Sequence, residues 1–151
     1  CVWLLVASAL VGLAVADRSE YLLYKELLKS YNMLERPVRA GESFEVTVYW
    51  SAEQKLDINY QSFIHVLAAD GFLVAQSDKL NPSDFPTRRW PLDKYVRDAY
   101  TVTIPEGVAP GVYDVAAGLW VSAEGWRLPV LDNVGNQLGD NFVIGEIVVV
   151  E

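Results

Sequence analysis

Residues 43–50 (SFEVTVYW) alternate between polar and apolar side chains, and this alternation constrains the fold more than any other feature of the chain. The apolar members, Phe44, Val46, Val48 and Trp50, fall on one face of an extended segment, as in a half-buried β-strand. Residues 98–104 (DAYTVTI) repeat the pattern, and residues 60–68 (YQSFIHVLA) are apolar on both faces, as in a central strand. From residue 36 onward the chain is therefore predicted to be β-structure.

Turn signals separate the predicted strands at short intervals. Asp70-Gly71 is a strong hairpin signal, and Gly125 lies near the tip of a second expected hairpin. The stretch 80–95 contains three prolines and is not expected to form a central strand. Short strands without helical periodicity between them predict an all-β fold: an antiparallel β-sandwich, immunoglobulin-like or jelly-roll-like, with about 7–9 strands. We place it at residues 27–151, with a first strand at 27–34 after a linker at 21–26.

The N-terminal residues 1–16 contain no charged side chain, and Asp17 is the first charge. We predict an apolar helix at residues 1–20 that attaches the chain to a membrane. As a helix, the sixteen uncharged residues span about 24 Å at 1.5 Å per residue, which is shorter than the hydrocarbon core, so they would be the end of a longer transmembrane helix. A signal-peptide h-region ending at 14–16, a lipid-bearing Cys1 and a buried core helix are the alternatives.

Composition excludes several classes of function. The formal net charge is −8, which argues against nucleic-acid binding and against electrostatic attachment to an anionic membrane surface. Because Cys1 is the only cysteine, no disulfide within the chain and no cysteine-based zinc site is expected. His65 is the only histidine, so most metal and acid–base sites are excluded as well. We predict no cofactor, no metal and no catalytic residues.

Five segments between residues 38 and 150 carry a family resemblance: VRAGESFEVTVYW, FIHVLAADGFLVAQSD, FPTRRW, APGVYDVAAGLW and LGDNFVIGEIVV. Over about three quarters of the chain, they resemble the C-terminal extracytoplasmic β-sandwich domain of bacterial membrane glycosyltransferases of the protein-mannosyltransferase type. A last transmembrane helix precedes that domain, as residues 1–16 suggest here. Members often have a Pro-Gly-Glu turn where this chain reads PLDK at 91–94. The resemblance implies fold and location but supplies no catalytic residues, because those lie in the membrane part of such transferases.

The loop at residues 85–90 is the first candidate binding site. Trp90 could stack on a sugar ring, and Arg88 and Arg89 could donate to hydroxyls or to a carboxylate. Alternatively, Trp90 fills the end of the domain while the arginines pair with Asp84 and Asp93.

A second candidate is an aromatic platform of Tyr113, Trp120 and Trp126, for which core packing is the alternative. His65 lies on an apolar strand face, where a buried histidine with satisfied hydrogen bonds is the expected interpretation. A further loop offers the oxygen ligands that calcium prefers, although its spacing matches no calcium motif and Asx residues also favour turns. Its polar members are Asp132, Asn133, Asn136, Asp140 and Asn141.

These observations predict a non-catalytic accessory domain, held at the cell membrane through residues 1–16 with the β-sandwich on the extracytoplasmic side. It would recognise a glycan or pack on a membrane glycosyltransferase. The alternative is a structural subunit of a membrane protein complex, and a secreted hydrolase is the third hypothesis.

Overall fold

The structure is a computed structural model that describes residues 7–8, 36–132 and 134–151. Within these residues it is mostly β-strand, with almost no helix, and its sheets form a curled half-barrel. The strands are β1 (Ala7–Ser8), β2 (Val38–Arg39), β3 (Ser43–Trp50), β4 (Gln61–Leu67), β5 (Leu73–Lys79), β6 (Val96–Thr103), β7 (Gly111–Val121), β8 (Trp126–Arg127), β9 (Val130–Leu131), β10 (Gln137–Gly139) and β11 (Phe142–Val150). Two short 3₁₀ helices, η1 (Pro82–Asp84) and η2 (Thr87–Arg89), lie in the proline-rich stretch. The all-β prediction is confirmed for this part of the chain.

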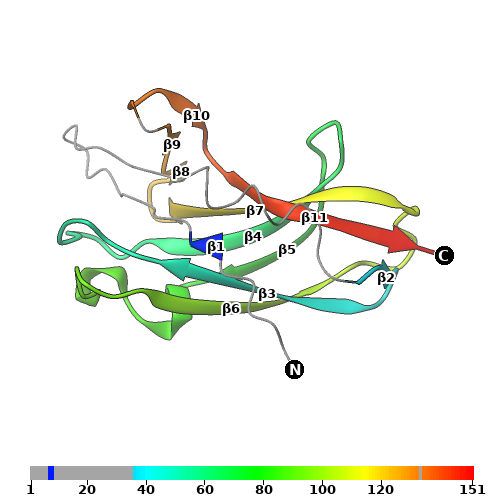
Figure 1. The fold of residues 1–151 in the computed structure, drawn as a ribbon, viewed down its shortest axis with the longest axis horizontal. Coiled ribbons are helices and arrows are strands. Elements are labelled where there is room, and N and C mark those ends of the chain that lie inside the picture. The colour runs from blue at the N-terminus through cyan, green and yellow to red at the C-terminus, as the bar shows by residue number, and fades with distance from the viewer. Residues whose placement is uncertain (1–6, 9–35, 133) are drawn as a thin grey trace.

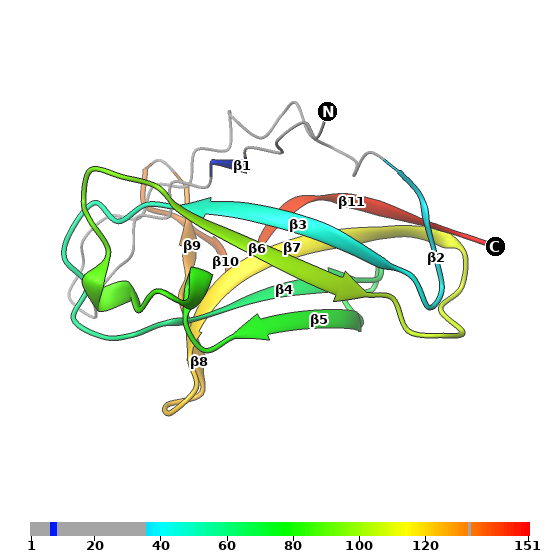
Figure 2. The same cartoon turned by 90° about the horizontal axis from the view of Figure 1, so that it is seen from below.

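Two sheets make up the body of the domain (Figure 1). The larger has the strand order β2-β11-β7-β4-β5, with β8 added beside β7, and the smaller has the order β1-β3-β6. The main pairs, β3 with β6, β4 with β5 and β7, and β7 with β11, are antiparallel as predicted. In Figure 2, β4 and β5 lie below β3. Strands β9 and β10 pair separately.

The predicted turns lie where the sequence placed them. The Asp70-Gly71 turn joins β4 to β5, where the Gly71 N–H donates to the Ala68 carbonyl at 2.8 Å. Gly71 has φ +82°, a left-handed conformation that residues with a side chain rarely adopt. Gly125 also has a positive φ and lies in the turn between β7 and β8. The glycine signals therefore identified both hairpins correctly.

The core lies between the two sheets. The apolar face predicted for β3 points into it, and β6 contributes Val96, Tyr100 and Val102. On the larger sheet, β4 faces the core through Ile64 and Val66 and β7 through its odd-numbered residues from 115 to 121. The opposite, outer face of this sheet carries a second set of side chains, described below.

A buried polar cluster joins the two sheets within this core. Asp98 of β6 is 0% exposed and pairs with the Lys79 ammonium of β5 at 2.8 Å. The Trp50 indole N–H donates to the same carboxylate at 3.0 Å, and the Tyr100 hydroxyl also donates to it beside Ser62. Burial and the charge of Asp98 raise the pKa of Tyr100 far above its usual value of 10, so the phenol stays protonated. The cluster holds the β5 edge against β6.

Most of the apolar segment at residues 1–16, the linker at 21–26 and the strand predicted at 27–34 lie outside the described residues. Of the predicted helix at 1–20 the structure describes Ala7 and Ser8 alone, which form β1 and pair in parallel with Val48 and Tyr49 of β3. No described helix is long and apolar enough to cross a membrane.

Candidate functional site: a hollow on the outer sheet face

The outer face of the larger sheet contains buried side chains that do not belong to the main core. Phe63 and His65 of β4 alternate with the core-facing Ser62, Ile64 and Val66, so they point to the other side of the sheet. Phe63 is 2% exposed and His65 is 6% exposed. Their burial on this face shows that the larger sheet is covered on both sides at its centre.

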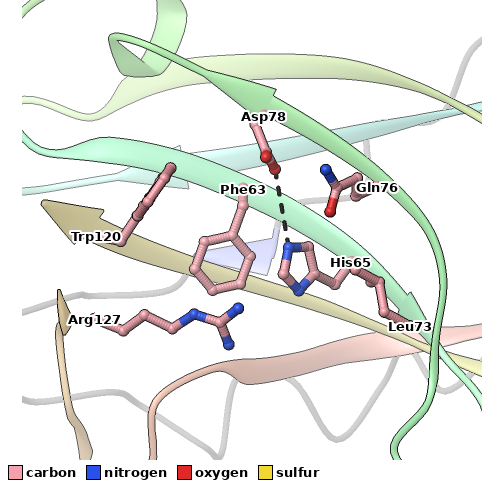
Figure 3. A pocket seen from close by; sticks show the side chains of 7 residues that line it. All are labelled: Phe63, His65, Leu73, Gln76, Asp78, Trp120 and Arg127. Atoms are coloured by element: carbon pink, nitrogen blue, oxygen red, sulfur yellow. Dashed lines mark ion pairs between the residues drawn. The ribbon is translucent and has the colours of Figure 1, made fainter. Parts of the chain in front are cut away.

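These side chains line a hollow of about 270 Å³, which opens to solvent on the outer face (Figure 3). The lining combines aromatic rings with an amide, a carboxylate and a guanidinium. Strands β4, β5, β7 and β8 provide it. The lining residues are Phe63, His65, Leu73, Gln76, Asp78, Trp120 and Arg127.

Phe63 lies at the centre of the group, and its position depends on a glycine in the neighbouring strand. Gly118 of β7 is the cross-strand partner of Phe63, and a Cβ at that position would lie 2.2 Å from the Phe63 ring. The ring therefore occupies the space that a side chain at 118 would fill. Phe63 also contacts His65, with ring centroids 4.2 Å apart, and Arg127, whose guanidinium carbon lies 4.8 Å from the ring centroid. Such cation–π contact holds the guanidinium in place.

Register brings Arg127 beside Trp120. The two residues are cross-strand partners in the β7–β8 hairpin and share its outer face. The Arg127 guanidinium also pairs with the Asp140 carboxylate at 3.6 Å. The indole nitrogen of Trp120 is buried and donates no hydrogen bond within the described part of the chain. A buried donor of this kind is costly unless something accepts from it.

Electrostatically, the hollow combines a neutral imidazole with a carboxylate. Burial, together with the nearby positive charge of Arg127, lowers the pKa of His65 to about 4, although Asp140 acts in the opposite direction. His65 is therefore uncharged at neutral pH. Its Nε2 lies 3.9 Å from Oδ1 of Asp78, and burial raises the pKa of that carboxyl. The imidazole can donate from one ring nitrogen and accept at the other.

The lining residues offer several kinds of non-covalent contact. They include hydrogen-bond donors, acceptors and an aromatic wall, but no Ser, Thr, Cys or Lys that could act as a nucleophile. No group of three or more His, Cys, Asp or Glu among the described residues could hold a metal ion. The geometry suits a small ligand that offers both an apolar face and hydroxyl groups.

The predicted loop site at residues 85–90 lacks an exposed ring. Trp90 is 6% exposed and belongs to the core, where its indole N–H donates to the Phe85 carbonyl at 2.8 Å. Arg88 and Arg89 are exposed on η2. Thr87 connects the loop to the segment before β4, because its hydroxyl donates to the Ile58 carbonyl at 2.8 Å. Trp90 therefore packs in the interior, as the alternative interpretation of this loop predicted.

The predicted aromatic platform is divided between two faces of the sheet. Trp120 points outward into the hollow, whereas Trp126 is the partner of Val121 and packs edge-to-face on Tyr60, with centroids 6.2 Å apart. Tyr113 packs against the main core, and its hydroxyl donates to the Ala109 carbonyl at 2.7 Å. Positions 113 and 120 differ by an odd number in one strand, so their side chains point to opposite faces. Strand parity therefore excludes the platform.

Five lining residues went unassigned in the sequence: Phe63, Leu73, Gln76, Asp78 and Arg127. The only available signal was the repeated i, i+2 spacing of polar or aromatic residues, Phe63 with His65 and Gln76 with Asp78. That spacing predicts a shared face within each strand. It does not predict which strands are neighbours, although the pairing of the strands determines which side chains form the site.

The Asx-rich loop is organised by its own hydrogen bonds. Asp132 accepts from the backbone N–H groups of Val134 and Asn136 and from the Asn136 amide. These bonds lower the pKa of Asp132. Asp140 lies apart from them, on Arg127. The turn interpretation accounts for Asp132 and Asn136, while Asn133 lies outside the described residues.

No protein-family model matches the sequence, and no solved structure matches the chain.

Proposed function

We propose that this chain provides a non-catalytic, carbohydrate-binding accessory domain, and that the outer-face hollow is its binding site. Its fold would be an antiparallel β-sandwich of the immunoglobulin-like or jelly-roll-like kind. The β domain would lie on the extracytoplasmic side of the cell membrane, attached through residues 1–16. There it would accompany a membrane glycosyltransferase of the protein-mannosyltransferase type, as the sequence resemblance suggests.

One observation carries the proposal: an aromatic wall and several polar groups converge on one hollow. Trp120 supplies a flat apolar surface that can stack on the apolar face of a sugar ring. Asp78 and Gln76 can accept from hydroxyl groups, and Arg127 and Gln76 can donate to them. A few convergent polar groups in an otherwise apolar concavity are typical of small-molecule sites.

The low pKa of His65 supports a non-catalytic role. With a pKa of about 4, His65 is a weak base at neutral pH, and the hollow offers it no hydroxyl or thiol to activate. Asp78 is the one carboxylate in the lining, whereas glycoside hydrolysis generally uses two.

The test is saccharide binding by the full chain in mild detergent, measured by calorimetry and by NMR. We expect binding that is lost in the Arg127→Ala variant and retained in Arg88→Ala, which removes an exposed arginine outside the hollow. Each variant's fold is checked by its amide spectrum. Binding that is equally sensitive to both substitutions, or absent from a broad saccharide panel, would refute the proposal.

The alternative role, packing against a membrane protein, is favoured by one exposed apolar feature. Phe72 and Leu73, next to the β4–β5 turn, are 69% and 39% exposed, and exposed apolar side chains that cluster often mark partner sites. A photo-reactive residue in place of Phe72 would test it in native membranes. A specific protein adduct that is absent with the same probe at the exposed Leu138 would support this role.

A further inference from the structure

The charges around the hollow are unevenly distributed. Arg127 is the one cation in the lining, and its guanidinium is already paired with Asp140 and stacked on Phe63. Asp78 is an anion in the same lining, 37% exposed at its side chain. One cation is thus opposed by two carboxylates before any ligand binds.

Two further carboxylates extend the negative charge over the same sheet face. Asp114 of β7 and Glu146 of β11 are cross-strand partners, and Asp114 is also the partner of Leu67 of β4. Position 114 has the parity of Trp120, so both carboxylates lie on the outer face. The whole chain has a net charge of −8. An anionic ligand would therefore approach against the local and the overall field.

The hydrogen-bonding groups of the lining also disfavour an anionic ligand. Asp78 accepts hydrogen bonds only, and a ligand hydroxyl can donate to it while accepting from Arg127 or Gln76. A ligand carboxylate cannot donate to Asp78 and would leave it facing a like charge. Like charges close together near a protein surface repel each other, and salt weakens this repulsion.

The size of the hollow limits the ligand further. Its volume of about 270 Å³ lies below the range of about 300–1,000 Å³ that is common for ligand pockets. Phe63 belongs to its lining, and the ring fills the space beside Gly118, where a Cβ would lie 2.2 Å from it. There is room for one ring and not for an extended oligomer.

We infer that the hollow selects a single uncharged sugar ring and discriminates against uronic acids and other anionic sugars. This inference rests on the proposed carbohydrate-binding function and narrows it to a ligand class. Trp120 stacks on the ring, Asp78 and Gln76 bind a pair of hydroxyls, and Arg127 donates from the β8 side.

The experiment compares matched pairs of methyl glycosides that differ only in charge: glucoside with glucuronide, galactoside with galacturonide, and mannoside with mannuronide. The full chain in mild detergent is titrated by NMR at low salt, and the Trp120 indole N–H, assigned from a Trp120→Phe variant, is the reporter. We expect at least one neutral member to bind with a Kd at least about tenfold below that of its uronide, a difference of about 1.4 kcal/mol.

Two carboxylate variants test whether Asp78 causes the preference for the neutral glycoside. Asp78→Asn should narrow the ratio of the two Kd values by at least about threefold, because it removes the like charge in the hollow. Asp93→Asn changes the net charge equally at an exposed loop position and should leave the ratio unchanged. Equal narrowing in both variants would assign the selectivity to net charge and overturn the inference.

The remaining outcomes separate the inference from the function on which it rests. If a uronide binds as tightly as its neutral partner or more tightly, the charge selection is refuted while carbohydrate binding stands. If neither member of any pair shifts the Trp120 resonance at millimolar concentrations, both are refuted.

Discussion

Replacement of Asp98 by alanine should be the most damaging polar substitution in the β domain. The carboxylate is fully buried, and it accepts from the Lys79 ammonium at 2.8 Å, the Ser83 backbone N–H at 2.7 Å and the Trp50 indole at 3.0 Å. Its loss leaves these donors in the core without their acceptor. The Lys79 ammonium also donates to the Ala99 carbonyl, at 2.6 Å.

The magnitude follows from the burial of both partners. Removing one member of a buried ion pair costs about 3–5 kcal/mol, because the other charge is left uncompensated. The Lys79 side chain is 25% exposed, so part of its charge can be rehydrated, and we expect the lower end, about 3 kcal/mol. Domains of this size have unfolding free energies of about 5–15 kcal/mol, so Asp98→Ala should remain folded with much reduced stability.

The assay is urea-induced unfolding followed by tryptophan fluorescence, with Asp93→Ala as the control for an exposed carboxylate. The control should change the unfolding free energy by less than about 0.5 kcal/mol. Adding Lys79→Met to Asp98→Ala should recover at least about 1 kcal/mol, since it removes the unpaired ammonium. A loss below about 1 kcal/mol in Asp98→Ala, or no recovery in the double variant, would refute this account of how β5 is held against β6.

Two other predictions concern the hollow. Gly118→Ala should cost about 1–3 kcal/mol of unfolding free energy in the same assay, because its Cβ would lie 2.2 Å from the Phe63 ring. Gly71→Ala is the control: its Cβ meets no neighbouring atom, so this variant should show only the cost of the positive φ. The pKa of His65 is lowered to about 4 in the folded chain, so between about pH 6.5 and pH 4 the unfolded chain protonates this imidazole more readily than the folded chain does. The unfolding free energy should therefore fall as the pH falls through this window, by about 2 kcal/mol from pH 7 to pH 5. The raised pKa of Asp78 opposes this loss towards the acid end. The His65→Gln variant should flatten the pH profile of the urea midpoint, and an equally steep profile in that variant would assign the effect to other groups.

Local patterns predicted a large part of the fold. The alternation in residues 43–50 gave the buried face of β3 correctly, because a strand places successive side chains on opposite sides. The Asp70-Gly71 and Gly125 signals located two turns because a positive φ strongly favours glycine. The stretch 80–95, with its three prolines, contains no strand residue, since proline lacks the backbone donor that a ladder requires.

The candidate site depended on information that no local pattern contains. Trp120 was the one predicted ligand-binding residue found in the hollow, while Trp90 and Trp126 turn to the interior. Arg127 reaches Trp120 through the register of a hairpin, and Asp78 reaches His65 through the pairing of β4 with β5. Register and pairing are set by which apolar faces fit together across the whole domain.

By itself, the sequence determined the strand-forming character of the chain after residue 36, its turns and its acidic balance, because these depend on neighbouring residues and on composition. Only the tertiary structure decided which side chains lie beside Phe63 and His65 on the sheet face away from the core. It also decided that Asp98 pairs with Lys79 inside the half-barrel. Both outcomes depend on contacts between residues distant in the chain, whose geometry is fixed only when the sheets close on each other.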